Sequence, residues 1–317
     1  MQTINSQTTP SDIRVRAYRV IKRLVLFLGV ILLVKHVLFD SVKVADSLMA
    51  PTLIRGDRIL VSRLASALPF SFVFNPEINS VAVVKEPFIS ENLLSYRIAA
   101  LPGDSIYIDQ GVFHNITRPD ISYAVSIKPE NAVPPEYSPR DYLQPLRLGS
   151  RGDTIRLDSL RIRDFTFAAS MVRQENPRKN HEIQCRFSLD GAIQSGYRVK
   201  DFALYKGPLD SIPQKYHFDY FFWDKLKAYL INTNTGSDVE LALFCKQNGK
   251  RLVQYTLRQS YIFFLSDNWQ RGYDSRYIGP IAESSIKGKA IFVLWSFEPG
   301  KPFFKSLRTN RLMKIIR

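Results

Sequence analysis

The side chains that most often bind metals or carry redox chemistry are few in this chain and are not spaced for either task. The two cysteines, Cys185 and Cys245, show no CxxC spacing. Two alternatives stay open for them: one disulfide in an oxidising compartment, or two unpaired buried thiols. The four histidines form no HExxH motif and stand at His36, His114, His181 and His217. The sequence therefore predicts no metal site and no cofactor.

Three short segments combine hydroxyl, carboxylate and guanidinium side chains with turn-forming residues. The first motif, residues 46–61, reads Asp-Ser-Leu-Met-Ala-Pro-Thr-Leu-Ile-Arg-Gly-Asp-Arg-Ile-Leu-Val. The second motif, residues 96–104, reads Tyr-Arg-Ile-Ala-Ala-Leu-Pro-Gly-Asp. The third motif, residues 266–279, reads Ser-Asp-Asn-Trp-Gln-Arg-Gly-Tyr-Asp-Ser-Arg-Tyr-Ile-Gly. Within it, we expect Asp274 and Arg276 to form an ion pair that holds a turn.

These motifs, in this order, resemble the signature boxes of bacterial type I signal peptidases: Ser-Met-x-Pro-Thr-Leu, Lys-Arg-x-x-x-Leu-Pro-Gly-Asp and Gly-Asp-Asn-Arg-x-Asn-Ser-x-Asp-Ser-Arg-Tyr-Trp-Gly. Gly288-Lys289-Ala290 before an apolar run and the Asn310-Arg311 ending are also similar. The resemblance implies a membrane serine endopeptidase whose general base is a lysine kept neutral by burial. The resemblance is carried by these motifs, and no motif of the family is recognised within residues 112–250.

The residues that carry the family's chemistry are replaced at the matching positions. Leu48 stands at the position of the nucleophile and Tyr96 at that of the base. Leucine has no lone pair for attack, and a phenol with a pKa of ~10 is a poor proton acceptor near neutrality. Asp46 replaces the serine that assists the oxyanion site, and Gly272 replaces the serine that orients the lysine. The residues expected to hold the fold are kept: Pro51, Thr52, Gly56, Asp57, Arg97, Pro102, Gly103, Asp104, Asp274 and Arg276.

This pattern predicts a catalytically inactive member that binds signal peptides by strand addition or pairs with an active signal peptidase. The alternative is an active signal peptidase that uses Ser47 with a relocated base. In an extended segment a one-residue shift turns a side chain to the opposite face, so Ser47 would need a local bulge to reach the site. Lys85 and Lys43 are the candidate bases for that alternative.

The N-terminal region predicts a membrane anchor. An apolar run over residues 24–34, extended to 21–39, follows five basic residues and is not followed by a small-residue cleavage site; the five are Arg14, Arg16, Arg19, Lys22 and Arg23. The sequence therefore predicts an uncleaved, single-pass signal anchor at 21–39 after a cytoplasmic tail at 1–20. By the positive-inside rule, the body lies in the periplasm, outside the inner membrane.

Beyond residue 40, short apolar or alternating runs broken by turn residues indicate antiparallel strands; they cover residues 58–61, 80–84, 105–108, 154–157, 260–265 and 290–295. Residues 221–231 fit one short amphipathic helix. The sequence predicts a mainly β fold in which an antiparallel core of a signal-peptidase type, 40–111 and 251–317, carries an inserted β-rich domain at 112–250.

The formal charge of +15 and the pI near 9.8 call for an anionic neighbour. No RNP-like pattern, zinc spacing, glycine-rich phosphate loop or helix-turn-helix supports nucleic acid. We therefore expect the acidic surface of a lipid bilayer as the partner, and no nucleic acid.

Overall fold

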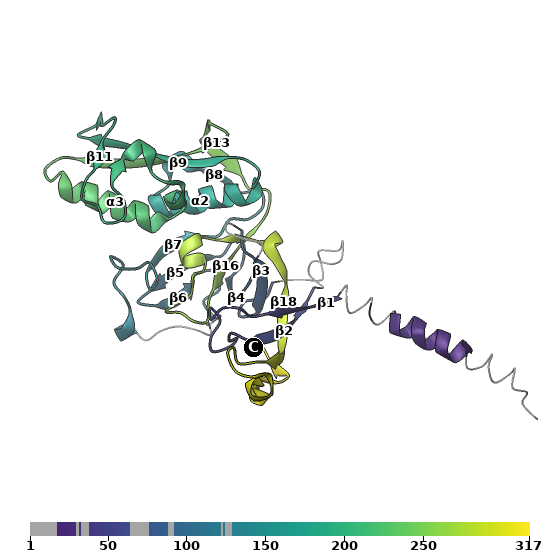
Figure 1. Ribbon diagram of the computed structural model, residues 1–317. Helices are drawn as coiled ribbons and strands as arrows, with labels where there is room; N and C mark the ends of the chain where they lie inside the picture. The colour runs from purple at the N-terminus through teal and green to yellow at the C-terminus, as the bar shows by residue number, and fades with distance from the viewer. Residues whose placement is uncertain are drawn as a thin grey trace, which may run out of the picture.

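The computed structural model describes residues 18–29, 32, 38–63, 76–87, 92–121, 123 and 129–317 (Figure 1). The body of the molecule is an antiparallel sheet of eight strands in the order β1-β2-β18-β3-β4-β16-β17, with β19 paired to β18. The strands are β1 (Phe39–Lys43), β2 (Asp57–Ser62), β3 (Val81–Lys85), β4 (Leu93–Ala100), β16 (Tyr261–Leu265), β17 (Ile281–Ala282), β18 (Ile286–Ser296) and β19 (Lys314–Ile315).

Alternation along the strands places two apolar clusters on opposite faces of this sheet. On β3, Val81 and Val83 join one cluster, and Ala82 and Val84 join the other. This is the period of two that a strand imposes on its side chains. The five residues of β16 are all buried, so a continuous apolar run replaces the alternation there. The predicted mainly β character is confirmed, and each predicted run overlaps an observed strand.

A second, three-stranded sheet, β6-β5-β7, packs on the body. It consists of β5 (Ser105–Asp109), β6 (Val112–Asn115) and β7 (Leu143–Arg147). Its apolar side chains share a cluster with residues of β4 and β16. Residue 112, where the predicted insert begins, is the first residue of β6. This strand forms a hairpin with β5 through a two-residue loop. The stretch through β7 therefore associates with the body.

Residues 154–256 form a second lobe, which lies above the body in Figure 1. Its sheet, in the order β10-β9-β13-β14, contains β9 (His181–Leu189), β10 (Ala192–Ile193), β13 (Val239–Gln247) and β14 (Lys250–Leu252). Two short pairs, β8 (Thr154–Arg156) with β15 (Gln254–Thr256) and β11 (Arg198–Val199) with β12 (Gly207–Pro208), complete its strands among the described residues. One apolar cluster joins the sheet to the helices α2 and α3.

The two long helices of the second lobe differ in how well the sequence predicts them. The predicted helix over 221–231 is confirmed as α3 (Tyr220–Thr233), which the side chain of Asp219 caps by accepting from the Phe222 N–H. Helix α2 (Ile162–Glu175) was not predicted, and the lobe is mixed α and β rather than simply β-rich. Every residue from 165 to 172 is buried, because the helix lies between the lobe and the body. A polar stripe of Arg163, Thr166 and Ser170 does recur at helical spacing, but all three side chains are buried, so this helix lacks the solvent-exposed face of a surface helix.

Short helical turns occupy several loops: η1 (Pro129–Asn131), η2 (Leu157–Ser159), η3 (Leu209–Ser211), η4 (Gln214–Tyr216), α4 (Ser275–Ile278), η5 (Glu283–Ser285), α5 (Phe303–Ser306) and η6 (Thr309–Arg311). The division of the chain into a core of 40–111 and 251–317 and an insert of 112–250 stays a prediction.

Both cysteines carry free thiols. In the β9–β13 register Cys185 lies opposite Leu243, and Cys245 lies opposite Ile183, so the cysteines are diagonal neighbours. Diagonal positions are ~7–8 Å apart, beyond the ~4.4–6.8 Å that separates the Cα atoms of most disulfides. Burial raises the pKa of Cys185 to about 12 and that of Cys245 to about 11. Of the two alternatives, the structure has the unpaired thiols.

The expected anchor at 21–39 lies partly outside the described residues, as does most of the tail at 1–20. Residues 18–29 are helical and exposed, and Figure 1 shows them away from the body. Among the residues that the structure describes, none belongs to a helix with the length and apolar character that crossing a bilayer requires.

Helix α2 attaches the second lobe to the body through main-chain atoms. The Ser170 hydroxyl donates to the Ile278 carbonyl at 3.3 Å, and Gln174 Nε2 donates to the Pro280 carbonyl at 2.9 Å. Gln174 Oε1 also accepts from the Ala282 N–H at 2.9 Å. The end of the third motif is therefore held by the second lobe.

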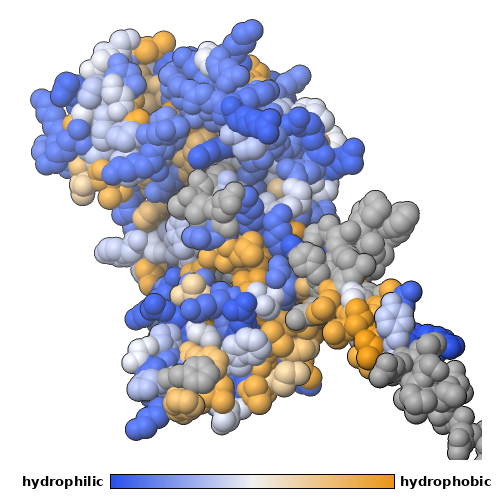
Figure 2. Space-filling view, turned by 45° about the vertical axis from the view of Figure 1, so that its right-hand side comes forward, coloured by the Kyte–Doolittle hydropathy of each residue, from blue (hydrophilic) through white to orange (hydrophobic). Residues whose placement is uncertain are grey.

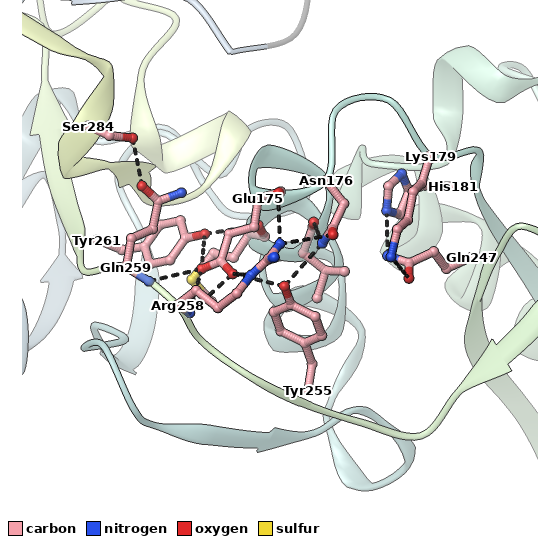
Figure 3. Close-up of polar contacts among 12 residues, drawn as sticks. Glu175, Asn176, Lys179, His181, Gln247, Tyr255, Arg258, Gln259, Tyr261 and Ser284 are labelled. Carbon is pink, nitrogen blue, oxygen red and sulfur yellow. Dashed lines mark hydrogen bonds and ion pairs between the residues drawn. The ribbon is translucent and has the colours of Figure 1, made fainter.

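The carboxylate of Glu175, at the end of α2, completes this attachment (Figure 3). It accepts hydrogen bonds from the main-chain N–H and the Nε of Arg258, at 3.0 and 3.1 Å. The hydroxyls of Tyr255 and Tyr261 donate to it at 2.8 and 3.1 Å, and the Gln259 N–H donates at 3.2 Å. One carboxylate therefore fixes the segment that leads from the second lobe into β16.

We predict that Glu175→Gln lowers the free energy of unfolding by about 2–4 kcal/mol, because the amide nitrogen cannot accept from the donors that converge on this buried position. Chemical denaturation of the full chain measures the change. Asp201→Asn removes the same charge from an exposed position of the same lobe and should change the value by less than about 0.5 kcal/mol. Equal midpoints for the two variants would contradict the prediction.

Candidate functional site

The guanidinium of Arg97, on β4, joins all three motifs. It is 3% exposed and forms a two-pronged ion pair with Asp267 of the third motif, with Nε–Oδ1 at 2.7 Å and Nη2–Oδ2 at 2.5 Å. Nη2 also lies 3.4 Å from Thr52 Oγ1 of the first motif, and Nη1 donates to the Arg317 carbonyl at 3.0 Å. Burial alone would lower the pKa of Arg97, but the hydrogen bond and charge of Asp267 raise it. Arg97 is therefore charged and fixed in place.

The first motif folds around the buried carboxylate of Asp57. Its Oδ2 accepts from the Ile54 N–H at 2.9 Å, and its Oδ1 accepts from Arg311 Nε at 2.9 Å. Arg311 also donates to the Thr52 carbonyl at 2.8 Å. Pro51 lies on the same loop, directly before Thr52, and is exposed. The Gly56 N–H donates to the Val44 carbonyl. The C-terminal segment therefore closes the loop that carries Ser47 and Leu48.

The turn of the second motif is held by Asp104. Its Oδ2 accepts from the Leu101 N–H and from Asn115 Nδ2, both at 2.9 Å. Gly103, next to Pro102, adopts φ +85°, a conformation that favours glycine because no Cβ meets the main chain. The turn therefore fixes the direction in which β4 ends.

The third motif contains a second buried ion pair, Asp274 with Arg276. Both side chains have no exposed surface, and Arg276 Nη2 lies 2.8 Å from Asp274 Oδ2. The guanidinium stacks 4.3 Å from the centre of the Trp269 ring and donates to the Trp269 carbonyl. Asp274 also accepts from the Ser266 N–H at 2.8 Å. These contacts fit a structural role, since they join residues of the loop to one another, and Arg276 Nη1 also donates to the Arg140 carbonyl at 3.3 Å.

Leu48 and Tyr96, at the positions expected for a nucleophile and a base, meet in one apolar cluster. Tyr96 is 2% exposed, and Leu48 packs against the same cluster. The Tyr96 hydroxyl donates to the Tyr273 carbonyl at 3.1 Å. Burial, followed by the negative charges of Asp274, Glu86 and Asp46, raises the pKa of Tyr96 well above its usual value. The phenol is therefore neutral at physiological pH, and its proton is donated to the Tyr273 carbonyl.

The carboxylate of Asp46 accepts a hydrogen bond from the main-chain N–H of Leu48. Its Oδ1 accepts from the Leu48 N–H at 2.9 Å. A main-chain N–H next to the attacked bond is the type of group that stabilises a developing oxyanion. Here that donor already faces a full negative charge, which would repel a second one.

Ser47 is exposed, and the contacts described for it use its carbonyl, which accepts from Asn268 Nδ2 at 3.1 Å. Lys85 pairs with Leu93 across β3 and β4, whereas Tyr96 pairs with Ala82, three residues away on β3. Three residues of a strand span about 10 Å. Lys43 lies on β1, which is separated from β4 by β2, β18 and β3 in the sheet order. The main chains of both lysines are thus distant from Tyr96, the residue at the position of the family's base.

Sequence reasoning did not single out Asp267, Arg311 or Ser266. Asp267 lies inside the third motif, and the need of a buried arginine for a carboxylate is the signal that could have pointed to it. Arg311 belongs to the Asn310-Arg311 ending, whose match carried no stated role. Ser266 lies beside Gly272, the residue expected at the place of the orienting serine. No pattern in the sequence shows that these two residues touch.

A cleft of about 1360 Å³ opens between the second lobe and the body. It is lined by aromatic and charged residues, among them Tyr107, Tyr142, Tyr220, Phe221 and Asp224. Burial raises the pKa of Asp224 to about 6. None of the residues predicted for the site lines this cleft, so its volume has no bearing on the chemistry at Leu48 and Tyr96.

We predict that Arg97→Met lowers the free energy of unfolding by about 3–5 kcal/mol, because it leaves the buried Asp267 carboxylate without a counter-charge. Arg147→Met is the control, since the Arg147–Asp153 pair is exposed and such pairs contribute ~0–1 kcal/mol. Urea unfolding of both variants measures the difference. A loss for Arg97→Met no larger than that of the control would refute the role of Arg97.

Comparison with known proteins adds to this geometry. The model of a family described as "Signal peptidase, peptidase S26" matches residues 17–125 and 149–295. A relative named Signal peptidase I, from Buchnera aphidicola subsp. Baizongia pistaciae (strain Bp), is 23% identical over 275 residues, which cover 83% of this chain and 72% of the relative. The family match extends across most of residues 112–250, where no motif was recognised in the sequence. The chain belongs to the signal peptidase family, peptidase S26.

Proposed function

We propose that this chain is a non-catalytic signal peptidase homologue that acts during protein export. Its binding partner is either a signal peptide or a second protein, an active signal peptidase. The observation that carries the proposal is the shared packing of Leu48 and Tyr96 in one apolar cluster. Hydrolysis by this family's mechanism needs an attacking oxygen and a neutral amine within hydrogen-bond reach. A hydrocarbon side chain and a phenol that already donates to Tyr273 supply neither.

The contact of Asp46 with the Leu48 N–H supports the same conclusion by a separate route. A tetrahedral intermediate carries a negative oxygen that needs donors. With the carboxylate in place, the transition state would lose a donor and gain a repulsive charge. Restoring a nucleophile and a base alone would therefore leave the site without its oxyanion donor.

The membrane is the second partner that we propose, with the N-terminus in the cytoplasm and the body in the periplasm at the inner membrane. In Figure 2 the visible surface of the body is more hydrophobic than that of the second lobe, which is mainly hydrophilic. Near the C-terminus, Phe304 is 94% exposed and Ile315 is 63% exposed. The basic residues Lys305, Arg308 and Lys314 lie between them in sequence. Apolar side chains flanked by basic ones favour an anionic lipid surface.

The test of the catalytic proposal uses the purified full chain and a precursor that carries a signal peptide, with an active signal peptidase as the positive control. We expect cleavage at the background rate, both for the unchanged chain and for Ser47→Ala, while the precursor still binds. Efficient cleavage that disappears in Ser47→Ala would instead establish the alternative, an active enzyme with Ser47 as its nucleophile and a relocated base.

The membrane proposal predicts that Trp295 lies close to lipid when the full chain is reconstituted in vesicles with anionic headgroups. Trp295 is 39% exposed, whereas Trp223 and Trp269 are buried at 0% and 3%. Brominated lipids should therefore quench part of the tryptophan fluorescence, and Trp295→Phe should remove that part. Quenching that is unchanged in Trp295→Phe would place this face away from the bilayer.

A further inference from the structure

Ser266 and Gly272, both in the third motif, compete for the same space. A Cβ atom on Gly272 would lie 2.5 Å from Ser266 Oγ and 2.9 Å from the Asn268 carbonyl oxygen. Non-bonded atoms do not approach so closely, so a side chain at position 272 excludes the side chain of Ser266. The family pattern has glycine at the first of these positions and serine at the second, and this chain has the reverse.

The hydroxyl of Ser266 is buried and has no hydrogen-bond partner among the residues that the structure describes. Ser266 has no exposed surface. Its main chain is fixed, because its N–H donates to Asp274 Oδ2. A buried hydroxyl without a partner is uncommon in folded proteins, and it points to a contact that the present side chains do not make.

The position of this hydroxyl relates it to residue 96. Gly272 directly precedes Tyr273, whose carbonyl accepts the Tyr96 hydroxyl at 3.1 Å. Because Ser266 Oγ lies beside the place of a Gly272 side chain, it lies on the same loop that receives the end of the residue 96 side chain. A Ser266 hydroxyl and a hydroxyl carried at 272 would both reach this region, from different points of the main chain.

We propose that Ser266 is a displaced positioning residue: it supplies from position 266 the hydroxyl that the family supplies from position 272. The proposal deepens the proposed function, on which it rests, since a site that lacks its nucleophile and base leaves this hydroxyl without a partner. Tyr96 takes the Tyr273 carbonyl instead. A lysine introduced at position 96 would place an amine in reach of Ser266 Oγ and would be oriented by it.

The exchange predicts a coupling in stability that requires no activity. Gly272→Ser alone should lower the midpoint of thermal unfolding, because the new Cβ collides with Ser266. Ser266→Gly together with Gly272→Ser should recover most of that loss, leaving only the tight contact with the Asn268 carbonyl. If the double variant unfolds at the temperature of Gly272→Ser, the two positions do not compete and the proposal fails.

The positioning role is tested by the pKa of the amine introduced by Tyr96→Lys in the full chain, followed by NMR titration. We expect Ser266→Ala to shift this pKa by at least about 0.5 units, because a hydrogen-bonded neighbour is lost. Ser170→Ala removes an equally buried hydroxyl on α2 and should leave the pKa unchanged. An unchanged pKa in Ser266→Ala would show that the hydroxyl does not contact the amine, and would overturn the proposal.

Cleavage by the triple variant Asp46→Ser, Leu48→Ser, Tyr96→Lys gives a second readout. Ser266→Ala in this background should lower kcat about tenfold, which is less than the ~10²–10⁴-fold contribution of a general base, because the base stays and loses only one orienting contact. Ser266→Gly with Gly272→Ser should restore it. If Ser266→Ala has no effect while the exchanged pair raises kcat, Ser266 only blocks position 272. The cleavage assay on the unchanged chain judges the proposed function separately, so the two can fail independently.

Discussion

The bidentate pair between Arg97 and Asp267 is the interaction on which the arrangement of the motifs depends. It lies between β4 and the end of β16, and its spare donors reach Thr52 and the Arg317 carbonyl. A buried guanidinium is tolerated only where its donors are satisfied. Four segments far apart in the sequence therefore have to meet at one point, and this requirement is independent of any catalytic side chain. It explains what holds the loop that carries Leu48 in place.

The changes at the candidate site are consistent with one another in physical terms. A neutral lysine in a dry pocket is held against its tendency to ionise, and a serine beside it needs hydrogen-bond partners. Leucine and tyrosine fill the same space with apolar atoms, and the one polar atom of Tyr96 finds a carbonyl. Asp46 accepts from the main-chain N–H of Leu48.

The sequence predicted the parts of the fold that follow from local pattern. Short apolar runs bounded by turn residues located β2, β3 and β18, and the run at 260–265 located β16. Trp223, Leu226 and Leu230 revealed α3, since they recur on one face. Helix α2 escaped because Phe167 packs into the cluster of the body while Phe165 and Met171 pack into that of the second lobe. Its polar side chains Arg163, Thr166 and Ser170 recur at helical spacing but are themselves buried, so the solvent-exposed face that usually marks an amphipathic helix is absent.

The candidate site was predictable in its residues but not in its contacts. Motif order located Leu48, Tyr96, Asp46 and Gly272, yet the pairing of Asp46 with a main-chain N–H depends on the turn that follows. The roles of Asp267 and Arg311 depend on segments that meet only in three dimensions. Steric competition between Ser266 and Gly272 likewise needs coordinates, because five residues of loop lie between two positions that touch.

The attachment of α2 to residues 278–282 uses main-chain oxygens and a main-chain nitrogen on the side of the body. A joint of this kind is indifferent to which side chains the body carries there. Mutation can therefore rewrite the third motif while the two lobes keep their mutual orientation. In evolutionary terms, the chemistry and the architecture of this chain were free to change at different rates.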